Sequence, residues 1–121
     1  MRTSRVGRPG DATISVTSPL PVPAGSELAV NVRWPSAPAG TKGRVEVHRR
    51  TNAPNGTEGI VASVDIDPAA LKGGVDVLLA IPPSCAPSFD GAGLEIAYVI
   101  RVLVDRRFRN DAAIERPVAI V

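Results

Sequence analysis

The chain has 121 residues, 44% of them hydrophobic and 21% charged, and a formal net charge of +2. This size and composition predict one globular domain with a hydrophobic core, and they exclude an intrinsically disordered chain. The small positive excess is too slight to indicate nucleic-acid binding, and no apolar run has the length of a membrane-spanning helix.

The first segment, residues 1–11, is predicted to be a flexible N-terminal arm. Arg2, Arg5 and Arg8 stand there among Gly, Ser and Pro, without the apolar stretch of an export signal. Residues 12–121 are predicted to form a single β-sandwich domain.

From residue 12 onward, apolar and polar residues alternate in seven segments, which is the pattern of strands that bury one face. Turn residues, chiefly the 12 Pro and 11 Gly, separate these segments at the spacing of a β-sandwich and leave little room for helix. The predicted fold class is therefore all-β, a seven-stranded antiparallel β-sandwich. The predicted strands carry their alternating apolar residues at Ile14 and Val16, Leu28 to Trp34, Val45 and Val47, Ile60 to Ile66, Val75 to Ile81, Leu94 to Val104, and Ile114 to Ile120.

One helical turn is predicted between the fourth and fifth of these strands. Asp67 can cap it, Pro68 suits the first helical position, and Gly73 follows Lys72 as a stop signal.

The core must be built mainly from aliphatic side chains, because the chain has one Trp, one Tyr and two Phe. We expect Trp34 and Tyr98 each to find a partner for its polar atom. Phe89 is predicted to be a plug that pins its loop against the sandwich, so that its truncation to Ala would cost about 3 to 5 kcal/mol. The predicted core residues are Val30, Val32, Trp34, Val47, Val64, Ile81, Phe89, Ile96, Tyr98, Ile100 and Val102.

Candidate catalytic and metal-binding residues are few. His48, the only histidine, lies on the polar side of its strand beside Arg49 and Arg50, where a solvated position is expected. Cys85, the only cysteine, lies in a proline-framed loop without a neighbouring cation to lower its thiol pKa, and it has no partner for a disulfide. We therefore predict no enzymatic activity, no metal and no cofactor. A chain without disulfides or an export signal is expected in the cytoplasm.

Basic residues gather at the predicted turn between the last two strands. Arg106, Arg107 and Arg109 occupy this turn, and Arg101 lies on the strand before it. Such a hairpin tip can dock an acidic protein partner. The alternative is a solvated tip that neighbouring acidic residues partly neutralise.

Residues 74–105 carry a further pattern. An apolar strand ends at Ile81-Pro82, a loop motif of Pro87, Ser88, Phe89, Asp90 and Gly91 follows, and the next strand contains Tyr98-Val-Ile-Arg-Val102. In this order, the segment resembles the arrestin superfamily.

The resemblance extends less tightly to the rest of residues 12–121. Residues 22–28, Val-Pro-Ala-Gly-Ser-Glu-Leu, look like the Pro-Gly-Glu turn before an early arrestin strand, and residues 115–120 are similar to the strand that ends such a sandwich. The resemblance implies a cytoplasmic scaffold or adaptor domain with an arrestin-like or immunoglobulin-like fold, similar to modules of bacterial sporulation-control proteins. Two features depart from the family: the chain has room for one sandwich where arrestins have two, and no buried charged network is found.

These observations predict a non-enzymatic protein-interaction domain that binds a protein partner by edge-strand pairing and by the basic hairpin tip. No nucleic-acid partner and no integral membrane segment are expected. The sequence leaves open whether the chain forms a homo-oligomer. The alternative is a structural subunit of a virion or another large assembly, which the compact β architecture and the arginine-bearing arm favour.

Overall fold

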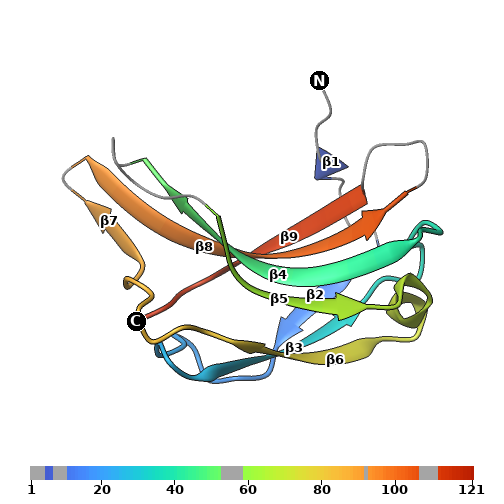
Figure 1. Cartoon of the computed structure of the whole chain (residues 1–121), viewed down its shortest axis with the longest axis horizontal. Helices are drawn as coiled ribbons and strands as arrows, with labels where there is room; N and C mark the ends of the chain where they lie inside the picture. The colour runs from blue at the N-terminus through green and yellow to red at the C-terminus, as the bar shows by residue number, and fades with distance from the viewer. Residues whose placement is uncertain (1–4, 7–10, 53–58, 92, 107–111) are drawn as a thin grey trace.

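Two β-sheets pack face to face in the computed structural model, which describes residues 5–6, 11–52, 59–91, 93–106 and 112–121 (Figure 1). The larger sheet has six strands in the order β1-β9-β8-β4-β5, with β7 paired to β8, and the smaller has the order β2-β3-β6. The strands are β1 (Arg5–Val6), β2 (Thr13–Val16), β3 (Glu27–Arg33), β4 (Lys42–Thr51), β5 (Gly59–Ile66), β6 (Val75–Ala80), β7 (Phe89–Gly91), β8 (Leu94–Asp105) and β9 (Ala112–Val118).

The predicted all-β sandwich is confirmed, but the described chain has nine strands where the sequence predicts seven. The two additional strands are β1 and β7, of two and three residues. They fall in segments predicted to be a flexible arm and a loop, and both are too short to show a period of two. All strand pairs are antiparallel except β1 with β9.

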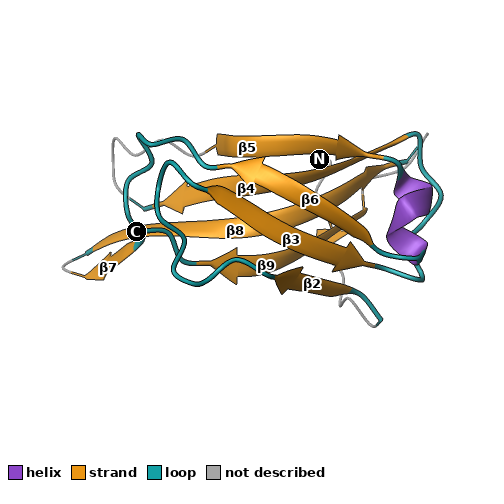
Figure 2. Ribbon diagram, turned by 90° about the horizontal axis from the view of Figure 1, so that it is seen from below, coloured by secondary structure: helices purple, strands orange, loops and turns teal. Residues whose placement is uncertain are grey.

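The predicted helical turn is present as the 3-10 helix η1 (Pro68–Lys72), at the end of the sandwich opposite β7 (Figure 2). The Asp67 carboxylate caps it by accepting a hydrogen bond from the backbone N–H of Ala69 at 3.0 Å. Within the described residues η1 is the only helical segment, and its five residues are far too few to cross a bilayer.

The core lies between the two sheets and is aliphatic, as predicted. Val64 and Ile96 are partly buried against this core. The prediction that Phe89 is a buried plug is wrong, because Phe89 is 48% exposed. The strand β7 and the start of β8 project past the smaller sheet, so the smaller sheet does not enclose Phe89 (Figure 1). The predicted core residues that are buried are Val30, Val32, Trp34, Val47, Ile81, Tyr98, Ile100 and Val102.

The larger sheet bends so that its outer face is concave (Figure 1). Side chains on this outer face are consequently less exposed than on a flat sheet. Glu46, which points outward from β4, is only 2% exposed.

Candidate functional site

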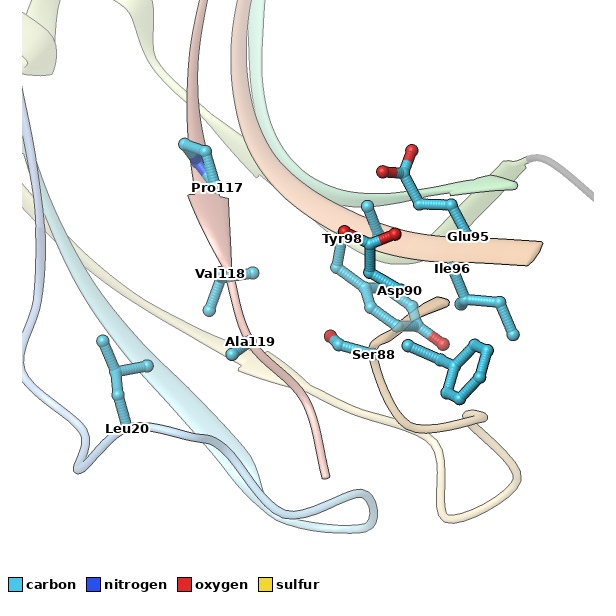
Figure 3. A pocket seen from close by; sticks show the side chains of 11 residues that line it. Leu20, Ser88, Asp90, Glu95, Ile96, Tyr98, Pro117, Val118 and Ala119 are labelled. Atoms are coloured by element: carbon cyan, nitrogen blue, oxygen red, sulfur yellow. The ribbon is translucent and has the colours of Figure 1, made fainter. Parts of the chain in front are cut away.

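A groove of about 450 Å³ lies between β7 and the end of β9 (Figure 3). This volume is within the range of small-molecule sites. Most of the lining side chains are apolar, and the polar ones are few. The lining residues are Leu20, Ser88, Phe89, Asp90, Glu95, Ile96, Ala97, Tyr98, Pro117, Val118 and Ala119.

The groove exists because β7 and β9 share one edge of β8. The other edge of β8 is taken by β4, which pairs with it from Ile96 to Asp105. On the shared edge, the last β7 pair involves Ile96 and the first β9 pair involves Tyr98, so Ala97 lies between the two partner strands. The groove therefore marks the point where the sheet changes from one neighbouring strand to the next.

The β7–β8 hairpin is short, and its register is well defined. Phe89 lies opposite Ile96, and Asp90 lies opposite Glu95. Gly93, close to the turn, has a φ of +79°, a conformation that glycine adopts without the steric cost of a side chain. Because side chains alternate along a strand, Phe89 and Ile96 share one side of the hairpin, and the two carboxylates share the other.

Hydrogen bonds fix both walls of the groove. The Ser88 N–H donates to the Ile120 carbonyl at 2.7 Å, and the Ile120 N–H donates to the Ser88 hydroxyl at 3.0 Å. The Val22 N–H donates to the Ala119 carbonyl at 2.9 Å, which holds the loop carrying Leu20 beside the last strand. The groove is thus largely preformed.

The acidic end of the groove is electrostatically unfavourable. Asp90 and Glu95 are both exposed and directly opposite each other, and like charges in this arrangement destabilise a strand pair. The Glu95 backbone is held in place, because its N–H donates to the Asn52 side-chain oxygen at 2.5 Å. Figure 3 shows the Asp90 and Glu95 side chains on one side of the hairpin and Ile96 on the other.

Tyr98 forms the inner part of the groove and is 1% exposed. Its hydroxyl donates to the Ala86 carbonyl at 2.6 Å, which confirms the predicted partner for its polar atom. Burial is the main cause that raises the pKa of Tyr98; Cys85 raises it further, and Arg49 acts in the opposite direction. The phenol is therefore uncharged at neutral pH. The effect of Cys85 on this pKa also shows that the fold brings the buried Cys85 side chain close to Tyr98.

The predicted basic site is only partly visible. Arg107 and Arg109 lie outside the described residues, and Arg106 directly follows β8. Arg101 points to the outer face of the larger sheet, where its Nε lies 2.8 Å from the Glu115 carboxylate. Glu115 also binds the Arg50 guanidinium at 2.5 Å. Arg101 and Arg50 therefore share one carboxylate, and Arg101 is part of this ion-pair cluster on the outer face.

His48 lies on the same outer face and is less solvated than its sequence position predicts. Its Nδ1 is buried and, among the described residues, has no hydrogen-bond partner. Burial is the main reason that its pKa is lowered. Arg101 and Arg50 lower the pKa further, while Glu46 and Glu115 raise it. The concave shape of the sheet accounts for this burial, because neighbouring strands shield the middle of β4.

The sequence did not predict this groove. The loop motif Pro87 to Gly91 was singled out for the arrestin resemblance, with Phe89 as a core plug, and three of its residues line the groove. Leu20, Glu95 and the segment 117–119 were not predicted. An isolated leucine between Pro19 and Pro21 was the only sequence signal for this part of the lining.

No protein-family model and no curated protein matches the chain. Among solved structures it is similar to the superoxide reductase (neelaredoxin) from Ignicoccus hospitalis and to two single-residue variants of that protein. In each case the identity is 12%, the match covers 90% of this chain and 80% of the other, and the TM-score is 0.48 or 0.49.

The comparison corrects four expectations. The arrestin resemblance is wrong, because the structural neighbours are superoxide reductases. The expected adaptor function and its alternative, an assembly subunit, are overturned with it, and so is the expectation of no enzymatic activity, since these neighbours are named as enzymes. The motifs that suggested arrestins are proline-bounded loops and alternating strands, which other β-sandwiches share. At this identity and TM-score, the likeness does not assign the neighbours' activity to this chain.

Proposed function

We propose that this domain binds a small ligand with an apolar body in the groove between β7 and β9. The observation that carries the proposal is the groove itself, which combines a suitable volume with exposed apolar side chains. Phe89 is 48% exposed and Leu20 is 49% exposed. Single exposed apolar residues are ordinary, but two that line one concave site provide apolar area for a ligand to cover.

The apolar side of the hairpin is the part of the groove suited to the ligand body. Phe89 and Ile96 face the same side as a cross-strand pair, and Val118 follows on the neighbouring strand. Covering this surface releases water, and the hydrogen bonds of Ser88 mean that little backbone has to be ordered on binding.

The expected affinity is modest for a small probe. A ligand of about ten heavy atoms that gains about 0.4 kcal/mol per atom binds with a dissociation constant of roughly 1 mM. Affinities of this size are measured by NMR titration of the labelled protein. A suitable neutral probe is 2-phenylethanol, which has an aromatic ring and a short chain.

The test is a titration of the ¹⁵N-labelled full chain with 2-phenylethanol. We expect shift changes at amides that line the groove, such as Ser88, Ile96 and Ala119, and we expect Phe89→Ala to weaken binding severalfold. Leu78→Ala is the matched control, because Leu78 is 57% exposed and lies on β6, away from the groove. Shift changes scattered over both sheets, or equal effects of the two variants, would contradict the proposal.

A further inference from the structure

We infer that the ligand of this groove is an organic cation, with its apolar body beside Phe89 and Ile96 and its positive group beside Asp90 and Glu95. The inference rests on the proposed function and adds the charge of the ligand. It starts from the unfavourable position of the two carboxylates, which face each other directly across the hairpin.

The described protein does not neutralise these carboxylates. Within residues 11–52, 59–91, 93–106 and 112–121, neither the Asp90 nor the Glu95 side chain forms an ion pair. Arg50 is on the strand next to β8, opposite Ala97, but its guanidinium is bound to Glu115 at 2.5 Å. The open end of the groove therefore carries two negative charges that a ligand can meet.

The apolar and the acidic side chains of the groove lie on opposite sides of the β7–β8 hairpin. Strand alternation places the apolar pair on one side and the acidic pair on the other, and both pairs line the same groove. Both sides of the hairpin border the groove because β9 ends at Val118, opposite Tyr98, and β7 begins at Phe89, opposite Ile96, so neither strand pairs with Ala97. A ligand that lies across the hairpin edge at Ala97 can place one end against the apolar side chains and the other end near the carboxylates. An alkyl or aryl ammonium compound has this combination of groups.

The size of the charge effect follows from exposure. An exposed ion pair contributes about two- to fivefold in affinity, so two carboxylates together favour a cation over a neutral analogue by about tenfold. Because the carboxylates are exposed, salt screens this preference. A monovalent ammonium group also suits a site of two carboxylates better than an anion, which both would repel.

The experiment compares three probes of matched shape: 2-phenylethylammonium, 2-phenylethanol and 3-phenylpropionate, each titrated into the ¹⁵N-labelled full chain. We expect the ammonium compound to bind about tenfold more tightly than the alcohol, and the carboxylate to bind most weakly. Raising NaCl from about 20 mM to about 500 mM should remove most of the difference between cation and alcohol.

Variants separate this inference from the proposed function. Glu95→Gln should lower the preference for the cation over the alcohol severalfold, because one of the two carboxylates is lost. Glu27→Gln is the matched control, because Glu27 is exposed at the start of β3 and does not line the groove. Equal binding of the ammonium compound and the alcohol would overturn the inference and leave the proposed function intact. Binding of none of the three probes at the groove would overturn both.

Discussion

The hydrogen bond from Tyr98 to the Ala86 carbonyl links the core to the groove, and Tyr98→Phe tests this link. The substitution keeps the ring and removes only the hydroxyl, so the packing of the 1%-exposed side chain should persist. It removes a 2.6 Å hydrogen bond and leaves a poorly solvated carbonyl without its partner. A net loss of about 0.5 to 1.5 kcal/mol for the bond, plus part of the cost of the unsatisfied carbonyl, gives a destabilisation of about 1 to 2 kcal/mol.

Urea unfolding followed by the fluorescence of Trp34, the only tryptophan and a buried one, measures this change. Thr17→Val is the matched control, because its hydroxyl also donates to a backbone carbonyl, that of Ala29 at 3.2 Å, but at an exposed position. We expect the control to lose less than about 0.5 kcal/mol. An equal loss in both variants would refute the reasoning that burial makes the Tyr98 bond important.

Three further predictions follow from single residues. Because burial lowers the pKa of His48 below its ordinary value of 6.5, the unfolded chain takes up a proton more readily, so the free energy of unfolding should decrease as pH falls from about 7 through 6.5 toward the pKa of the folded protein. Urea unfolding at several pH values should show a shallower decrease in His48→Gln, and identical pH profiles would contradict this origin. Gly40→Ala should destabilise the fold by about 1 to 3 kcal/mol, because the added methyl group would contact Val104 and lie 2.5 Å from a backbone oxygen, whereas Gly73→Ala, with open space around it, should be nearly neutral in the same thermal unfolding assay. Phe89→Ala should cost about 1 kcal/mol or less in thermal unfolding, because half of the ring is already in solvent, and a loss of 3 kcal/mol would mean that the ring is enclosed in solution.

The sequence by itself determined the class of fold. In β8, the alternation from Leu94 to Val104 predicts one apolar face, and the structure buries Ile100, Val102 and Val104 on that face. The helical turn at η1 was equally predictable, because Asp67 and Pro68 act on their own backbone neighbours. These features depend on residues that are adjacent or alternate in sequence, so a local pattern is sufficient to reveal them.

The existence and the lining of the groove were determined by the tertiary structure alone. Alternation shows which side chains share a face of a strand, but it does not show which strands are neighbours or how far one sheet extends past the other. The opposition of Asp90 and Glu95 depends on the register of a three-residue strand. The exposure of Phe89 depends on the projection of β7 beyond the smaller sheet (Figure 1). The burial of the His48 Nδ1 atom depends on the curvature of the whole sheet, which is a property of six strands together and not of β4.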